Sequence, residues 1–152
     1  MLGKKVTTII LILFVISSIF VMISKIIKED TADTNINNLP ENIDVVYYFH
    51  TNYRCETCEL LEKNTGEVME EYYSEELRDG TLIWKVINTD EEGNQHFRDD
   101  YELYSGAVVL VKRRNGKEIT FKSLELIWEL VYDEPEFKKY MSSEVKSFLG
   151  SN

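Results

Sequence analysis

Two cysteines, two prolines and two histidines are all that this chain of 152 residues holds of those three residue types. A protein that uses disulfides for stability usually carries more than one pair, so the cysteines do not predict a disulfide scaffold. The sequence also lacks a glycine-rich phosphate loop, a His-x-x-x-His pair and a serine-nucleophile motif. These absences argue against nucleotide-binding, zinc-hydrolase and serine-hydrolase sites of the usual kinds.

Positive charge is scarce as well, and it is unevenly distributed. All 27 acidic residues follow Lys28, whereas four of the 17 basic residues do not, so the part after Lys28 has a net charge of −14. A surface of this sign repels phosphate backbones, which excludes nucleic acid as a partner of this part. It also argues against a domain that lies flat on anionic lipid.

A long uncharged run fills the N-terminus. Residues Val6 to Ser24 are dominated by Ile, Leu, Val, Phe and Met, and as a helix they would rise about 28 Å, close to the hydrocarbon thickness of a bilayer. Residues 1–28 are therefore predicted to form an uncleaved membrane anchor. A cleaved signal peptide is the alternative, although Asp30-Thr31-Ala32 is a poor cleavage site. No cysteine follows the run closely, which excludes a lipid-anchored start.

Two lysines flank each side of this run, and the acidic residues after it resist translocation little. We therefore expect a single-pass membrane protein whose N-terminus is cytoplasmic and whose C-terminal domain lies outside the cytoplasm. Residues 29–43 are polar and are predicted to be a tether. Residues 44–152 are predicted to form one α/β domain that ends in an extra C-terminal helix.

Hydrophobic periodicity and turn residues predict the elements of that domain. Strands are expected at 45–49, 82–87, 107–111 and 117–121, with a hairpin turn at Asn115-Gly116 between the last two. A helix is expected after the cysteines, through about residue 73, with a site for a bend or break at 64–66. Three more helices are expected to start at Asp90, Ser123 and Asp133, the last with Pro135 in its first turn.

The two cysteines form the motif Cys55-Glu56-Thr57-Cys58, which follows the first strand and opens the first helix. Amide groups and the dipole at a helix N-terminus favour a thiolate there. The thiolate is the nucleophile of disulfide exchange, so this placement predicts a redox site that needs no cofactor.

The order of strand, Cys-x-x-Cys helix, strand, helix, hairpin and helix resembles the thioredoxin fold over roughly residues 44–131. This resemblance implies a mixed sheet of about four strands flanked by helices and a redox-active Cys55–Cys58 disulfide. It also implies that Cys55 is the nucleophile and Cys58 the resolving thiol. The run from Tyr47 to Cys58 is similar, more narrowly, to small membrane-anchored thioredoxin-like proteins labelled nitrophenyl-compound nitroreductase subunits of an arsenic-resistance type.

The chain departs from thioredoxins at several positions. Arg54 stands where thioredoxins place a tryptophan; its guanidinium favours a thiolate, whereas Glu56 opposes one. Ala107 and Val108 occupy the region of the family's cis-proline, which predicts poor docking of a generic disulfide substrate. Phe49 takes the place of the family's buried acid.

His50 is the nearest alternative proton carrier to that missing acid. Its other interpretation is a strand-end histidine that is hydrogen-bonded to the backbone. Together with Arg54, Glu56, Thr57 and Val108, His50 completes the set of supporting residues predicted around the cysteines.

Several functions fit this pattern. The first is a membrane-tethered thiol–disulfide oxidoreductase that acts on a disulfide or dithiol of an exported protein. The second is binding and transfer of a soft metal or metalloid by the same thiols, which His50 and His96 would complete to four ligands, although no known zinc spacing matches. An accessory subunit of a redox complex and a purely structural disulfide are the others.

Overall fold

The computed structural model describes residues 39–151. The predicted anchor, residues 1–28, and residues 29–38 of the predicted tether lie outside this range. Within it, none of the helices has the length and apolar character that a membrane crossing requires. The predicted membrane anchorage and orientation therefore stay predictions.

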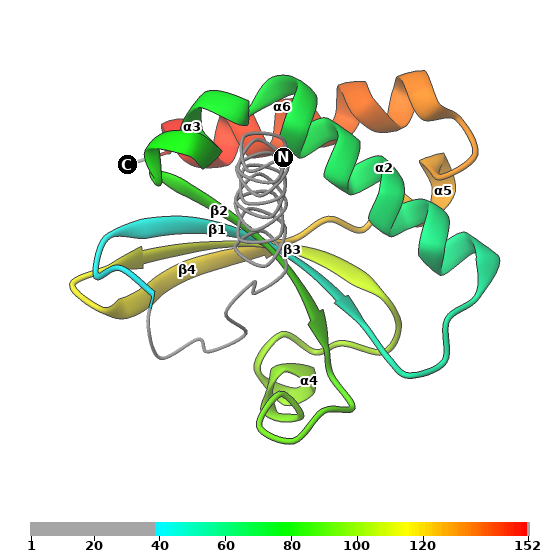
Figure 1. Cartoon of the computed structure of the whole chain (residues 1–152), viewed down its shortest axis with the longest axis horizontal. Helices are drawn as coiled ribbons and strands as arrows, with labels where there is room; N and C mark the ends of the chain where they lie inside the picture. The colour runs from blue at the N-terminus through cyan, green and yellow to red at the C-terminus, as the bar shows by residue number, and fades with distance from the viewer. Residues whose placement is uncertain (1–38, 152) are drawn as a thin grey trace, which may run out of the picture. The chain divides into compact units, whose positions relative to one another are not determined.

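The domain is built on one mixed sheet of four strands, as predicted (Figure 1). The strands are β1 (Ile43–His50), β2 (Leu82–Asn88), β3 (Ala107–Arg114) and β4 (Lys117–Ser123). They lie in the order β2-β1-β3-β4, with β1 and β2 parallel and the other two pairs antiparallel. Asn115 and Gly116 both have positive φ, 53° and 73°, which is the backbone of the predicted tight turn between β3 and β4.

Strand β1 is central in the sheet and is covered on both faces, which explains why its sequence is a continuous apolar run. Successive side chains of a strand point to opposite faces. Val46 and Tyr48 accordingly belong to one buried cluster, and Val45, Tyr47 and Phe49 belong to the other.

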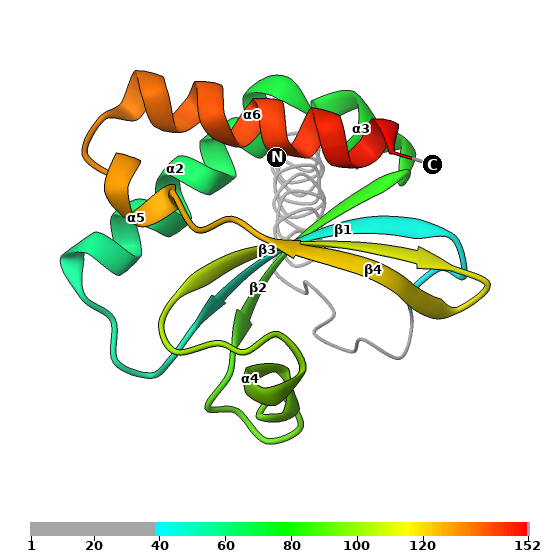
Figure 2. The same ribbon diagram turned by 180° about the vertical axis from the view of Figure 1, so that it is seen from behind.

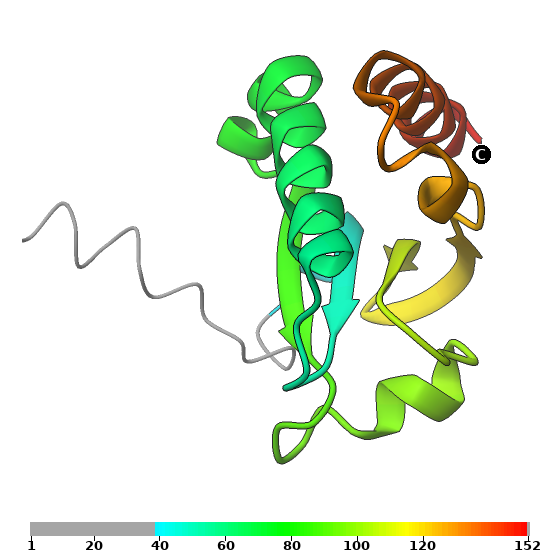
Figure 3. The same ribbon diagram turned by 90° about the vertical axis from the view of Figure 1, so that its right-hand side faces the viewer.

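Four helices cover the face that carries Tyr48: α2 (Glu56–Tyr72), α3 (Ser74–Asp79), α5 (Ile127–Leu130) and α6 (Glu134–Gly150). The short α4 (His96–Asp100) lies on the opposite face (Figure 2). There Phe97 packs against Phe49. Helices α2 and α6 lie side by side (Figure 3). Lys138 of α6 joins them, with its Nζ 3.3 Å from Glu67 and 3.2 Å from Glu71. The arrangement has the thioredoxin-like order of elements that the sequence predicted.

Three details differ from the predictions. Helix α2 runs unbroken through residues 64–66, because Asn64 and Thr65 are buried against the domain and the Thr65 hydroxyl donates to Leu61 O at 2.6 Å. Asp90 does not cap a helix, since α4 begins only at His96. Ser123 ends β4 and caps no helix.

The start of the domain also differs from the predicted boundary at residue 44. Ile43 is fully buried in β1, and the carbonyl of Glu41 accepts a hydrogen bond from the Gly116 amide at 2.9 Å. Asn42 accepts another from the Asn115 amide. Residues 41–43, assigned to the tether from their composition, are therefore part of the domain.

The C-terminal helix begins as predicted and is anchored at its far end. The Asp133 side chain accepts from the amide of Glu136 at 3.3 Å, and Pro135 stands in the first turn. Lys112, which is buried in β3, donates to Phe148 O at 3.0 Å and also to Ser151 O. The ammonium group thus ties the C-terminal end of α6 and its C-cap residue to β3.

Candidate active site around the Cys55–Cys58 disulfide

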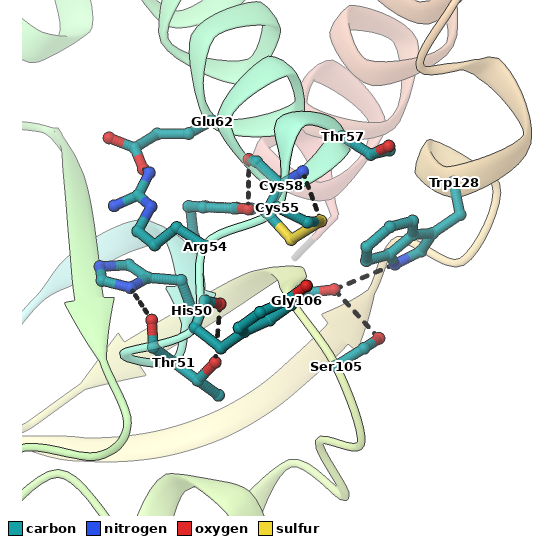
Figure 4. Close-up of a disulfide and its surroundings, with 12 residues drawn as sticks. His50, Thr51, Arg54, Cys55, Thr57, Cys58, Glu62, Ser105, Gly106 and Trp128 are labelled. Carbon is teal, nitrogen blue, oxygen red and sulfur yellow. Dashed lines mark hydrogen bonds and ion pairs between the residues drawn. A yellow bond between two sulfur atoms is a disulfide. The ribbon is translucent and has the colours of Figure 1, made fainter.

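Cys55 and Cys58 form a disulfide at the first turn of α2, with their Cα atoms 5.0 Å apart (Figure 4). Cys55 is the N-cap residue of the helix. Its Sγ accepts a hydrogen bond from the Cys58 amide at 3.1 Å. In the reduced protein the same amide would point at the Cys55 thiolate, so the local backbone favours charge on this sulfur. Both cysteines are partly exposed.

A buried tyrosine supports the motif from below. The Tyr48 side chain has no solvent exposure, and its hydroxyl donates to Cys58 O at 2.7 Å. Burial, with a smaller contribution from the Glu62 carboxylate, raises the pKa of Tyr48 to about 12. The hydroxyl therefore stays protonated at neutral pH and remains a hydrogen-bond donor to the helix.

Gly106, just before β3, lies beside the disulfide and forms one wall of the site (Figure 4). A Cβ atom added here would lie 3.2 Å from the Tyr48 hydroxyl and 3.4 Å from Phe49 O. The first distance is tight, so a larger residue here would push the Tyr48 hydroxyl by a few tenths of an ångström, and glycine leaves it in place.

Trp128 of α5 completes this wall beside the sulfurs (Figure 4). Its indole Nε1 donates to Gly106 O at 3.0 Å, and 37% of its side chain is exposed. Thr57, the third residue of the motif, lies 2.6 Å (Oγ1) from the Tyr132 hydroxyl. The link between α5 and α6 is thus fastened to the start of α2.

The two charged residues predicted to have opposite effects on the Cys55 thiolate, Arg54 and Glu56, are in different environments. Arg54, which precedes the helix, forms an ion pair with Glu62 in the second turn of α2 (Figure 4). Glu56 is exposed and has no ion pair within residues 39–151. The positive charge of Arg54 is therefore largely compensated by Glu62, a residue four positions beyond the motif.

His50 is the strand-end histidine bonded to the backbone that was the alternative to a proton carrier. Its Nδ1 lies 2.9 Å from Thr51 O, and the ring is turned away from the sulfurs (Figure 4). Phe49 points to the α4 face of the sheet, away from the motif. The polar group beneath the cysteines is Tyr48, which the strand's alternation could have identified, because it shares a face with His50.

His96 and Val108 do not take their predicted places. His96 lies in α4, where its Nδ1 is 2.6 Å from Asp100, and α4 covers the other face of the sheet. Over residues 39–151, no three His, Cys, Asp or Glu side chains are grouped as metal ligands. The four-ligand site was therefore a wrong prediction. Val108 is buried inside β3 opposite Tyr48, so Gly106 is the residue of this segment beside the disulfide.

The loop before Cys55 is held by polar contacts to the end of β2 and to the segment after it. The Asn52 amide donates to Asp90 Oδ2 at 2.7 Å, and the Asn88 amide group donates to Asn52 Oδ1 at 2.8 Å. Arg98 forms an ion pair with Asp90. The hydrogen bond from Asn52, followed by the charge of Arg98, holds the pKa of Asp90 below its ordinary value.

Comparison with known proteins finds only distant structural likenesses. No family model and no curated protein matches the sequence. Thioredoxin from Trypanosoma brucei brucei is 14% identical with a TM-score of 0.43, covering 76% of this chain and 87% of that one. Thioredoxin f2 from Chlamydomonas reinhardtii is 17% identical with a TM-score of 0.40, covering 68% and 90%. A thioredoxin-like protein from Clostridium perfringens is 15% identical with a TM-score of 0.40, covering 73% and 90%.

These similarities are too low to carry an argument about function. Nothing in the comparisons supports the narrower resemblance to nitroreductase subunits.

Proposed function

We propose that this protein is a membrane-tethered thiol–disulfide oxidoreductase that acts on a disulfide or dithiol of another protein outside the cytoplasm. One observation carries the proposal of redox activity. The Cys55 sulfur lies at the N-cap of α2 and accepts a hydrogen bond from the Cys58 amide at 3.1 Å. The uncharged run from Val6 to Ser24 supports the tether.

The chemistry follows from the two sulfurs. The Cys55 thiolate attacks one sulfur of the substrate disulfide, so that a mixed disulfide forms and one substrate thiolate leaves. Cys58 then gives its proton to that thiolate and attacks the Cys55 sulfur. The Cys55–Cys58 bond forms, the second substrate thiolate leaves, and two electrons have passed from the protein to the substrate. The reverse sequence oxidises a substrate dithiol.

The reduction potential of the full chain in detergent micelles tests the redox part. A catalytic pair should equilibrate with glutathione buffers at a potential above about −300 mV, whereas structural disulfides lie below it. A Cys55→Ser/Cys58→Ser protein is the control for signals that do not come from the disulfide. A potential below that limit would assign the bond to stability.

Two measurements address the tether. The full chain should stay in the membrane fraction after carbonate extraction, and protease added from outside should digest residues 44–152. Release as a soluble fragment would contradict the anchor, and protection from the protease would contradict the orientation. The nitroreductase-subunit resemblance adds a proposal that the protein works as an accessory subunit, and co-purification from its native membrane would test it.

A further inference from the structure

We infer that a groove beside the disulfide selects substrate segments that carry lysine or arginine next to apolar side chains. This inference rests on the proposed function for its biological use, because it names the class of substrate that the same site accepts. It does not rest on that function for its physical test, since binding to a groove can be measured without disulfide exchange.

The groove has a volume of about 520 Å³ and lies between two segments of the chain, residues 101–107 and residues 121–128. Gly106 and Trp128 belong both to this groove and to the wall beside the sulfurs (Figure 4). One end of the groove therefore lies next to the disulfide, and a substrate segment bound in the groove would place its neighbouring residues beside the sulfurs. Tyr104, Phe121 and Trp128 line it with side chains that are 97%, 44% and 37% exposed.

The charges of the groove have one sign. Its lining includes the carboxylates of Glu102 and Glu125 and no Lys, Arg or His. Both carboxylates are exposed, and neither forms an ion pair with any residue of the range 39–151. Other glutamates of the domain do have partners: Glu62 has Arg54, and Glu144 has Lys122. The groove thus presents two uncompensated negative charges beside exposed aromatic rings.

This combination fits one kind of occupant, an extended segment of a disulfide-bearing protein with both apolar and cationic side chains. An apolar side chain would cover Phe121 and Trp128. An ammonium or guanidinium group would pair with Glu102 or Glu125 and lie over an aromatic ring. The net charge of −14 after Lys28 adds long-range attraction for the same partner. An acidic segment would be repelled, and a neutral one would leave both carboxylates unused.

Disulfide exchange with matched peptides tests the inference. Three synthetic peptides share the same apolar residues and one cysteine, which forms a mixed disulfide with a fluorescent thiol. They differ only at two flanking positions, which are both Lys in the first peptide, both Ser in the second and both Glu in the third. With the reduced full chain in a neutral detergent, the Lys peptide should react about three- to tenfold faster than the Ser peptide, because two exposed ion pairs are each worth a small factor. The Glu peptide should be the slowest, and 0.5 M NaCl should narrow the differences.

Charge variants identify the groove as the cause. In Glu102→Gln/Glu125→Gln the Lys-to-Ser rate ratio should lose most of its excess over one, and the small remainder reflects the net negative charge of the domain. Glu75→Gln/Glu92→Gln makes the same change in net charge at two exposed positions outside the groove, and it should keep the ratio. Glu102→Gly is a second variant that should fold readily, because Glu102 has a φ of 54° that glycine adopts more easily; it should lower the ratio by part of the same amount.

Binding separates this inference from the proposed function. Labelled peptides with serine in place of cysteine are titrated with the oxidised full chain and followed by fluorescence anisotropy. If the Lys peptide binds more tightly than the others, and this preference is lost in the double glutamine variant, the groove inference is supported even when no disulfide is exchanged. The absence of exchange would contradict only the proposed function. Equal binding of the three peptides would overturn the inference, whatever the exchange rates. Self-association of the chain that the double variant abolishes would assign the groove to a second copy and also overturn it.

Discussion

The Tyr48 hydroxyl lies 2.7 Å from the carbonyl oxygen of Cys58, so a side chain of the central strand is hydrogen-bonded to the Cys-x-x-Cys motif itself. Tyr48 is fully buried and faces Val108 of β3 and Val86 of β2 in the sheet register. The first turn of α2 is thereby fixed to the middle of the sheet. The position of the disulfide consequently depends on the packing of the whole domain as well as on its own helix.

Replacing this tyrosine should weaken the domain. Tyr48→Phe keeps the ring and removes the buried hydrogen bond, so the free energy of unfolding is expected to fall by about 1 kcal/mol. Urea denaturation of the oxidised full chain, followed by circular dichroism, measures it. Tyr132→Phe is the matched control: it also removes a hydroxyl contact, but Tyr132 is 75% exposed, so its effect should stay within about 0.5 kcal/mol. Equal effects would show that the Tyr48–Cys58 contact has no special weight.

Two glycines should respond to alanine in opposite directions. Gly106→Ala places a Cβ 3.2 Å from the Tyr48 hydroxyl, and such overpacking is expected to lower the free energy of unfolding by about 1–3 kcal/mol. Gly66→Ala, inside α2, meets no atom within 4 Å and should raise it by about 0.5–1 kcal/mol through helix propensity. The same urea titrations decide. A Gly106→Ala protein as stable as the natural one would mean that this wall of the site is not tightly packed.

The two thiols should differ in reactivity. Cys55 stands at the helix N-cap and its sulfur accepts the Cys58 amide at 3.1 Å, which favours its thiolate. In single variants of the full chain, Cys55 in Cys58→Ser should therefore be alkylated faster, and from a lower pH, than Cys58 in Cys55→Ser. Iodoacetamide labelling from pH 4 to pH 9 gives both rates. Faster alkylation of Cys58 would reverse the assignment of nucleophile and resolving thiol.

Asp90 should make the stability depend on pH in the acid range. The hydrogen bond from the Asn52 amide, and then the charge of Arg98, hold the folded-state pKa of Asp90 below its ordinary value. The contribution of Asp90 to the free energy of unfolding is therefore fully present above an ordinary carboxyl pKa of about 3.9. It is lost as the pH falls through the folded-state pKa. The urea midpoint of the natural chain should therefore exceed that of Asp90→Asn at pH 6, and this difference should shrink below about pH 4. Asp99→Asn, at an exposed position without an ion pair in residues 39–151, should show no such difference. A gap between the natural chain and Asp90→Asn that is constant from pH 6 to pH 2 would contradict the role of the charge.

Local rules predicted some features well and failed at others for a physical reason. Asp133 caps α6 and Asn115 opens the hairpin turn, as their sequence contexts indicated. Asp90 and Ser123 have the residue types of helix caps but serve elsewhere: Asp90 accepts from the Asn52 amide across 38 positions of sequence, and Ser123 closes a strand. A side-chain oxygen binds whichever amide the fold brings to it, so the residue type alone does not choose between a cap and a loop contact.

The sequence by itself determined the apolar runs that form the strands, the order of the elements and the placement of Cys55 at the start of a helix, because these depend on neighbours within a few residues. Only the tertiary structure decided what surrounds the sulfurs. Tyr48, Gly106 and Trp128 are far apart along the chain, and they meet because β1 and β3 are adjacent in the sheet and α5 folds back to the start of β3. The pairing of Arg54 with Glu62 and the exclusion of His96 likewise depend on where the side chains point in the folded domain, which residue spacing does not specify.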